Sequence, residues 1–307
     1  MRKNYQDFYM GIVKYRKIWY TISGLLVLAS LFCVFYYGLN VGIDFKGGSL
    51  LEVEYINNRP DISLLQKEIE GLNFGNINIL SAGDKGLLVR SRNLTEEEHQ
   101  ALLEKLSLKG GAEYKELRFD SIGPIIGKEL RQKSWVAIVL VVMMIILYIA
   151  FAFRKVSRPV SSFKFGLMAI VALIHDITTP LGVFAVLGKF WGVEIDILFI
   201  TAILTVLGFS VHDTIVVFDR IRENLKKGIG KDFEETVGTS VRQTITRSIN
   251  TSLTVILVLL SIFIFGGETT KYFALALMIG VFVGTYSSIF LASPLLVTLY
   301  KFQNRKK

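Results

Sequence analysis

The stretch that decides the fold is "GFSVHDTIVVFDR", residues Gly208–Arg220, which ends a long apolar segment and carries His212 and Asp213 inside it. A helix of about 20 apolar residues crosses the roughly 30 Å hydrocarbon core of a bilayer. Ionisable side chains are costly at that depth, so they face other helices or a water-filled cavity and mark functional sites. The stretch therefore predicts a membrane protein with a polar site between its helices.

Six segments of the chain are apolar enough to span a membrane, and 51% of the 307 residues are hydrophobic. The segments are Ile18–Leu39, Ser134–Phe153, Phe165–Gly188, Val193–Phe218, Ser248–Gly266 and Tyr272–Tyr300. The first is too long for a cleavable signal sequence, so we expect a retained signal anchor. The chain is predicted to be a polytopic α-helical membrane protein with a first helix in residues 1–39, a soluble domain at 40–133 and a five-helix region at 134–307.

The basic residues predict the topology. Lys and Arg number five in residues 1–17, four in 154–164, six in 219–246 and four in 301–307, whereas the short alternate loops hold only Lys189 and Lys271. Basic loops stay on the cytoplasmic side, so we expect cytoplasmic termini and an extracytoplasmic domain at 40–133. The net charge of +9 then reflects topology and contact with the lipid membrane. No basic–aromatic pattern points to nucleic acid.

The soluble domain alternates strand and helix patterns. Residues 49–56, 77–80, 86–90 and 112–120 predict strands, and residues 61–72 and 95–108 predict helices. Thr95 and Glu98 have the spacing of a capping box, and His99 is expected on the solvated side of the same helix. The order β-α-β-β-α-β predicts a small α+β ferredoxin-like domain. We expect such a domain to touch another protein or to transmit movement.

The fifth span carries a polar face. Arg247, Asn250, Thr251 and Thr254 follow i, i+3, i+4, i+7 spacing, which places them on one side of an otherwise apolar helix. Arg247 is expected at the depth of Asp213, where an opposite charge would stabilise the buried carboxylate. We therefore expect an ion relay built from an Asp213–Arg247 pair, with His212, Asn250 and Thr251 beside it. The alternative, polar glue between two helices, stays open.

The third span contains a second polar group in "LIHDITTPLG". His175 and Asp176 are adjacent, and Pro180 follows four residues after Asp176, where it cannot donate to the Asp176 carbonyl. We expect a kink or a loosened turn there, with Thr179 or water satisfying the freed carbonyl. His175 and Asp176 are thus a candidate secondary polar site.

No cofactor, metal site or enzymatic activity is expected. The single cysteine, Cys33, excludes an internal disulfide and indicates no metal framework, and no nucleotide-binding glycine loop is present in the sequence. The ion handled by the relay would be H⁺ or Na⁺. In the sixth span Gly280, Gly284, Ser288 and Ala292 recur every four residues, which predicts close helix packing.

Four stretches carry a resemblance to a known family. They are "VGIDFKGGSLLEVEY" (41–55), "FDSIGPIIGKEL" (119–130), "DTIVVFDRIREN" (213–224) and "TRSINTSLT" (246–254). They closely resemble the SecF family of bacterial protein-export membrane subunits, and the resemblance extends over essentially the whole chain. One departure is His212, where the family commonly has an asparagine before the aspartate.

The resemblance implies a six-span half of an RND-superfamily-like transporter in the bacterial plasma membrane. It implies a SecD-like six-span partner, a place beside the SecYEG channel and a preprotein substrate that is drawn outward by the proton or sodium motive force. It also implies that Asp213 and Arg247 are the key intramembrane residues. Because the chain starts with a charged segment and holds one set of six spans, we expect a separate subunit rather than a fusion.

Two other functions stay open at this point. One is a subunit of an RND-type small-molecule exporter, although 94 residues between the first two spans are few for a drug-sized pocket. The other is a structural scaffold of the translocation channel, which would not require an intramembrane aspartate and arginine.

Overall fold

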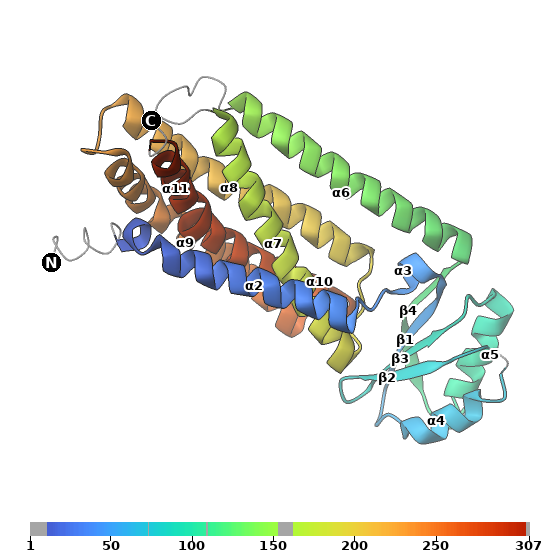
Figure 1. The fold of residues 1–307 in the computed structure, drawn as a ribbon. Coiled ribbons are helices and arrows are strands. Elements are labelled where there is room, and N and C mark those ends of the chain that lie inside the picture. The colour runs from blue at the N-terminus through green and yellow to red at the C-terminus, as the bar shows by residue number, and fades with distance from the viewer. Residues whose placement is uncertain (1–10, 73, 109, 153–161, 305–307) are drawn as a thin grey trace. The chain divides into compact units, whose positions relative to one another are not determined.

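The structure is a computed structural model that describes residues 11–72, 74–108, 110–152 and 162–304 (Figure 1). Its contacts divide the chain into two units: a membrane unit, Met1–Asn40 with Ala137–Lys307, and an outer unit, Val41–Val136. Most of the basic loop at 154–164 lies outside the described residues. The two units are therefore considered one at a time.

The membrane unit is helical, and six helices are long and apolar enough to cross a bilayer, as predicted. They are built from α2 (Arg16–Tyr37), α6 (Pro124–Ala152), α7 (Ser162–Trp191), α8 (Ile197–Lys226), α9 (Phe233–Phe265) and α10 (Glu268–Ser287), the last continued by a π-helical turn η1 (Ser288–Ala292) and by α11 (Ser293–Asn304). The main difference from the sequence prediction is at α9, which begins at Phe233 rather than at Ser248. Residues 219–246, expected as a cytoplasmic loop, are therefore mostly helix.

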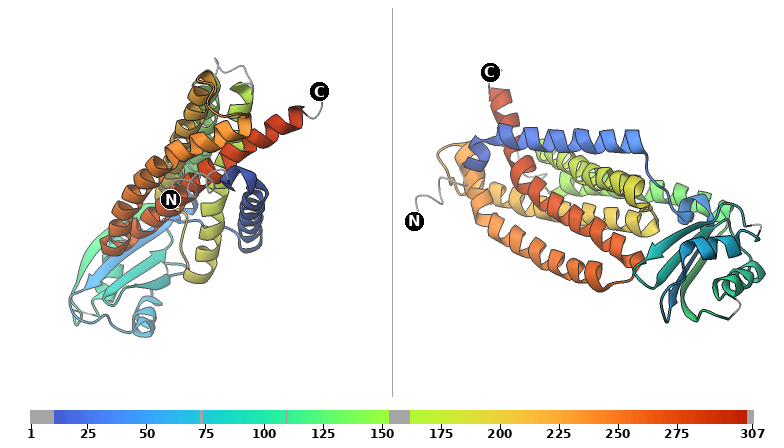
Figure 2. Two further views of the ribbon diagram at one scale, coloured as in Figure 1. Left: turned by 90° about the vertical axis from the view of Figure 1, so that its left-hand side faces the viewer. Right: turned by 90° about the horizontal axis from the view of Figure 1, so that it is seen from below.

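The helices run alongside one another (Figure 2), and three of them form the packed centre. The apolar windows of α7, α8 and the α10–α11 segment are 56%, 50% and 67% buried, against 11%, 6% and 17% for α2, α6 and α9. Phe165 of α7 meets Phe218 of α8 edge to face, with ring centroids 5.2 Å apart. The centre is thus where an ionisable side chain is shielded from lipid by protein.

The outer unit has the predicted β-α-β-β-α-β order. It contains a short helix α3 (Ile43–Lys46), then β1 (Gly48–Tyr55), α4 (Ile62–Ile69), β2 (Asn78–Ala82), β3 (Gly86–Ser91), α5 (Glu96–Leu106) and β4 (Tyr114–Ile122). The four strands form an antiparallel sheet in the order β2-β3-β1-β4. This is the ferredoxin-like arrangement, and the prediction is confirmed.

One face of the sheet is covered by the two helices. Val53 pairs with Leu87 in register, and both are fully buried with Leu65 of α4 and Leu102 of α5 in one apolar cluster. The Tyr55 hydroxyl donates to the Leu106 carbonyl at 3.0 Å. Burial raises the pKa of Tyr55 to about 12, so this hydroxyl stays neutral and keeps its bond at physiological pH.

His99 is not solvated as predicted but buried, with only 4% of its surface exposed. Its ring stacks on Phe119 with centroids 3.6 Å apart and planes 1° from parallel. Nδ1 lies 3.3 Å from a Glu96 carboxylate oxygen. The helix turns this residue toward β4 because aromatic stacking outweighs the hydration of a neutral imidazole.

Gly47 of the "DFKGG" stretch and Gly127 of α6 bring the start of β1 close to the start of α6 within the outer unit. Gly47 adopts φ +80°, and a Cβ there would lie 2.9 Å from the Pro124 Cα. From the other side, a Cβ on Gly127 would lie 2.9 Å from the Gly47 amide nitrogen. A side chain at either position would push β1 and α6 apart, and the φ of Gly47 is one that other residues rarely adopt.

Candidate functional site

Asp213 lies in the middle of the packed helices, as predicted, but its partners are hydroxyl groups. The carboxylate is 6% exposed. Oδ1 accepts a hydrogen bond from Ser248 Oγ of α9 at 2.6 Å, and Oδ2 accepts one from Ser288 Oγ of η1 at 3.0 Å. Hydrogen bonds to a charged acceptor are worth roughly 1.5–3 kcal/mol each, so these two hydroxyls stabilise the ionised carboxylate.

The expected Asp213–Arg247 ion pair is absent from the described residues. Arg247 precedes Ser248, so its predicted depth is correct, but consecutive residues point about 100° apart on a helix and Arg247 lies on the exposed side of α9. Asn250 and Thr251 are exposed on α9 as well, and His212 is exposed on α8. The structure thus brings none of these four residues into contact with Asp213.

The face of α9 that packs inward carries small hydroxyl residues instead. Ser240, Thr244, Ser248 and Ser252 recur every four residues, and all four are buried. Small polar side chains at this spacing let helices approach closely and bond across the interface. This spacing is visible in the sequence, but the larger Arg247, Asn250 and Thr251 had indicated the wrong face.

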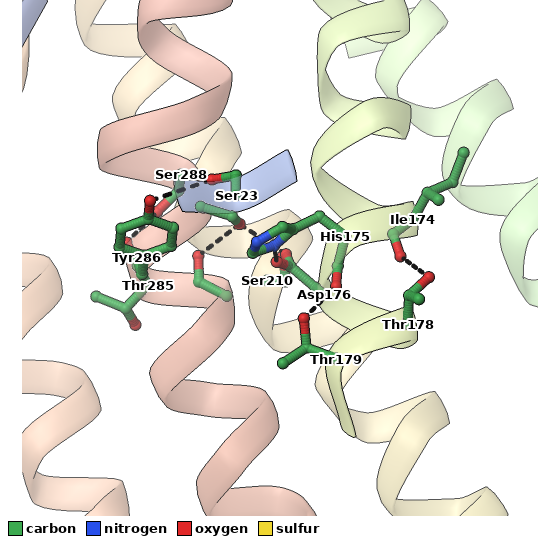
Figure 3. A network of polar contacts seen from close by, with 12 residues as sticks. Ser23, Ile174, His175, Asp176, Thr178, Thr179, Ser210, Thr285, Tyr286 and Ser288 are labelled. Atoms are coloured by element: carbon green, nitrogen blue, oxygen red, sulfur yellow. Dashed lines mark hydrogen bonds and ion pairs between the residues drawn. The ribbon is translucent and has the colours of Figure 1, made fainter. Parts of the chain in front are cut away.

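Asp176 is the more deeply buried of the two aspartates, with no exposed surface. Its Oδ2 accepts hydrogen bonds from Ser210 of α8 and from Ser287 of α10, the latter at 2.7 Å. Its Oδ1 lies 2.9 Å from Nδ1 of His175. Figure 3 shows this group between α7, α8 and α10, with Tyr286 and Ser23 close to the imidazole.

The turn around Pro180 differs from the prediction in one contact. Helix α7 continues without a break from Ser162 to Trp191 with Pro180 inside it. The Thr179 hydroxyl donates to the His175 carbonyl at 2.9 Å, not to the carbonyl of Asp176 that Pro180 leaves without its helical donor. A threonine hydroxyl reaches the carbonyl four residues before it, and for Thr179 that residue is His175.

Consecutive residues of the last helical segment hold the two aspartates. Ser287 ends α10 and bonds Asp176, while Ser288 begins η1 and bonds Asp213. Ser293 Oγ donates to the Ser288 carbonyl at 2.8 Å, five residues back, inside the π-turn. Single π-turns inside helices occur often at functional sites. The small-residue ridge predicted for packing therefore also supplies a ligand to the polar site through Ser288.

The close approach of α8 and α10 depends on the glycines of that ridge. A Cβ on Gly280 would lie 2.1 Å from Val206 Cγ2, and one on Gly284 would lie 3.0 Å from Ser210 Cβ. Without side chains at these positions, Ser210 and Ser288 reach the aspartates from opposite helices. The prediction of close packing is confirmed.

The two buried aspartates are bonded by hydroxyl groups and, in the case of Asp176, by an imidazole. Among the described residues, neither Asp176 nor Asp213 pairs with a lysine or arginine. No group of three or more His, Cys, Asp or Glu residues that could hold a metal ion occurs in the described part of the chain.

Six candidate spans, a ferredoxin-like outer domain and carboxylates buried between the central helices define a transport-type membrane protein, the six-helix half of an RND-like bundle. Residues 103–302 match the family described as "Protein export membrane protein SecD/SecF, C-terminal", and residues 37–55 match the "SecD/SecF GG Motif". The chain belongs to the SecF family of protein translocase subunits. It is similar to the protein translocase subunit SecF of Thermobaculum terrenum, with 44% identity over 94% of this chain and 93% of the relative.

Further relatives and solved structures agree with this membership. The protein translocase subunit SecF of Anaerolinea thermophila is 39% identical over 94% of this chain and 93% of its own. The crystal structure of SecDF, a translocon-associated membrane protein from Thermus thermophilus, matches 95% of this chain with a TM-score of 0.79 and 34% identity. This chain spans only 38% of that SecDF chain.

Proposed function

We propose that this translocase subunit uses the proton or sodium motive force to promote preprotein export across the bacterial plasma membrane. The observation that carries the proposal is Asp213, a carboxylate that is buried between three helical segments and, in the described part of the chain, is hydrogen-bonded by Ser248 and Ser288. A purely structural contact between helices would not require an ionisable group in lipid, where the free-energy cost is high. An exporter of small molecules or a passive scaffold has no comparable observation in its favour.

A SecD-like six-span subunit is the proposed partner. The exposed side of α9 carries Arg247, Asn250 and Thr251, and a guanidinium directed into lipid is unfavourable. The SecDF chain is more than twice as long as the part that this chain matches, which leaves room there for a second six-helix half. Arg247 therefore acts toward the partner half, and the relay is completed only when the two halves meet.

The wider assembly is proposed from the family. The subunit works without catalytic chemistry of its own, beside the SecYEG channel and on a preprotein emerging from it. Both termini lie in the cytoplasm and residues 40–133 outside, because the Lys and Arg asymmetry favours that orientation. The outer domain contacts the emerging chain or passes movement to it.

The proposed step is a change in the charge of Asp213. Arginine remains protonated at all relevant pH values, so the carboxylate is the group that binds and releases the ion. Loss of the negative charge weakens the hydrogen bonds that Asp213 accepts from Ser248 of α9 and Ser288 of η1. Helix movement that follows would open the site to the opposite side of the membrane and drive the outer domain.

The test uses vesicles that contain the subunit, its SecD-like partner and the channel, with an imposed proton or sodium gradient. Asp213→Asn keeps the shape of the side chain but removes the titrating group, so gradient-driven export should fall about a hundredfold at unchanged abundance. Asp219→Asn is the matched control, since Asp219 lies exposed at the end of the same helix, and should retain activity. Wild-type export by Asp213→Asn would overturn the proposal.

A further inference from the structure

His175, which contacts Asp176, has a buried ring nitrogen without a hydrogen-bond partner among the described residues, and the proposed relay through Asp213 does not use it. His175 is 2% exposed, and its Nε2 has no hydrogen-bond partner among the described residues. Its other nitrogen, Nδ1, is engaged with Asp176. Unpaired buried polar atoms cost roughly 1–3 kcal/mol, so a nitrogen left open in this way calls for an explanation.

The surroundings of the imidazole are polar on the side away from Asp176. The Tyr286 ring lies 5.9 Å from the imidazole centroid, and its hydroxyl bonds Ser23 Oγ at 3.1 Å. Trp19 Nε1 of α2, beside Tyr286, is a second buried nitrogen without a partner in the described part of the chain. Several convergent polar atoms of this kind suit a proton-carrying molecule such as water.

The pair also stands in a defined position relative to Asp213. Ser210, which bonds Asp176, precedes Asp213 by three residues on α8, which is a rise of about 4.5 Å. The contact of Asp176 with α8 therefore lies about one helical turn closer to the start of that helix. Two buried carboxylates follow one another along the direction in which an ion crosses the bundle.

We propose that Asp176, served by His175, is a second proton-binding site coupled to Asp213 through the consecutive residues Ser287 and Ser288. The inference rests on the proposed ion-coupled function, and it adds a group to which no role has been given. The ligand is the proton rather than a metal cation, because one of the carboxylate oxygens faces an imidazole nitrogen. Hard cations such as Ca²⁺ are held by oxygen ligands, whereas histidine is a proton shuttle.

The proton balance is simple. An incoming proton binds the lone pair of His175 Nε2, and the proton on Nδ1 passes to Oδ1 of Asp176. The imidazole is neutral before and after, with its tautomer exchanged, and the carboxylate becomes a neutral acid. Release follows the same path in reverse, so no other reactant is needed.

Coupling to Asp213 follows from the shared helical turn. A neutral Asp176 accepts more weakly from the hydroxyls of Ser210 and Ser287. Ser287 is followed directly by Ser288 at the start of the π-turn, so a rearrangement of that turn changes the hydrogen bond to Asp213. The titratable groups at the pair are His175 on α7, which contacts Asp176, and Tyr286 on α10, whose ring lies 5.9 Å from the imidazole. Asp213 lies three residues after Ser210 on α8, and α2 contributes Ser23, which bonds the Tyr286 hydroxyl.

The test is infrared difference spectroscopy of the full chain with its SecD-like partner in lipid nanodiscs, recorded as the pH is lowered. Asp176→Asn should remove one titrating carboxyl band and move the titration midpoint of the remaining Asp213 band by about one pH unit, a tenfold change in proton affinity. His175→Gln keeps a hydrogen-bonding group but not the shuttle, so protonation of Asp176 should slow by about tenfold or more. Thr178→Val, a half-buried position on the same helix whose hydroxyl donates to the Ile174 carbonyl, should leave both bands unchanged.

Two results would overturn the inference. One is an Asp176→Asn spectrum with the full set of titrating bands and an unmoved Asp213 midpoint. If that variant does not accumulate, Ser287→Ala and His175→Gln decide: wild-type midpoints and rates in both mean that the pair is structural. Because these readouts do not depend on export, they remain distinct from the Asp213→Asn export test, whose failure would remove the relay itself.

Discussion

Two of the described histidines lie beside carboxylates, one in each unit, and the two sites differ in what surrounds the acid. In the outer unit His99 lies beside Glu96, whose side chain is 67% exposed. In the membrane unit His175 lies beside Asp176, which is 0% exposed. Water can replace the histidine as a partner of Glu96, but nothing except protein donors can do so for Asp176. An imidazole beside a carboxylate therefore serves packing in the outer unit, and we propose that it serves proton transfer in the membrane unit.

The difference indicates that the side chains that stabilise the fold and the side chains that act in transport are distributed differently in the two units. In the outer unit the buried side chains are mainly apolar, with Glu52 and His99 as exceptions. Most charged groups there stay at the surface, where their contribution to stability is small. In the membrane unit, two carboxylates remain in the centre with serine donors. Such sites reduce stability unless every donor is present, so we expect substitutions there to act on transport first.

The largest effect on export is expected when the hydroxyl donors of Asp213 are removed. This experiment tests whether the two units differ as described. Ser248→Ala combined with Ser288→Ala removes both hydrogen bonds and destabilises the ionised carboxylate by roughly 1.5–3 kcal/mol for each bond. The aspartate then no longer alternates between its two charge states under the working gradient. Gradient-driven export in vesicles should fall about a hundredfold, while the amount of protein in the membrane stays similar.

Ser261→Ala is the control for that experiment, since Ser261 lies exposed on the same helix and bonds only the Leu257 carbonyl. Export by the double variant within about twofold of wild type would mean that the hydroxyls are packing groups. The membrane site would then resemble the outer unit, and the comparison would fail.

Much of the fold could be predicted because its determinants are local in sequence. Length and apolar composition define the six spans, and alternation of apolar residues, with Thr95 as a helix cap, defines the outer unit. The π-turn at Ser288 could not be predicted, because an α-helix and a π-turn have the same apolar pattern. It depends on the backbone's fit against α7 and α8.

The candidate site was predicted in its position and not in its contacts. Asp213 and its depth relative to α9 followed from apolar spans and helix geometry. The face of α9 did not, because charge complementarity favoured Arg247 over its neighbour Ser248, and the sequence of one chain does not show what lies against the exposed face of a helix. His99 was misplaced for a related reason: its stacking partner Phe119 is distant in sequence.

A smaller effect, on the stability of the outer unit, is expected from substitution of His99. His99→Ala removes the stacking on Phe119 and leaves a cavity, which should lower the free energy of unfolding of the outer unit by about 2–4 kcal/mol. His99→Leu should restore part of it, because an apolar side chain fills the same space, although the contacts of the ring nitrogens with Glu96 and Glu116, at 3.3 and 3.4 Å, are lost. Hydrogen exchange of the β1 and β4 amides in the full chain measures the difference.

Transport is the second readout for that pair. At temperatures where the outer unit is folded, His99→Leu should export at the wild-type rate, unlike His175→Gln. Equal losses of gradient-driven export in both variants would show that the two histidines act alike, and that burial of the acid does not decide the role.

The smallest effect concerns a surface carboxylate of the outer unit, Glu98. The Arg92 guanidinium, and after it the Thr95 backbone N–H, hold the pKa of Glu98 below its ordinary value of 4.5. A carboxyl whose pKa is lower in the folded state contributes stability that is present above its unfolded pKa and is lost as the pH falls through the folded value. The outer unit should therefore lose a small amount of stability below about pH 4.5.

Glu98→Gln should weaken the start of α5 at pH 7 and lose less stability on acidification. Glu104→Gln, on the exposed side of the same helix, should follow wild type at both pH values. Hydrogen exchange of the first-turn amides of α5 at pH 7 and pH 4 would measure this, after correction for the intrinsic exchange rate. Identical pH dependence in wild type and Glu98→Gln would mean that the ion pair with Arg92 contributes nothing, as many exposed ion pairs do. Because Glu98 faces water, the expected effect of its substitution is far smaller than the effect of removing the serine donors of Asp213. A carboxylate at the surface of the outer unit thus matters less than one buried in the membrane unit.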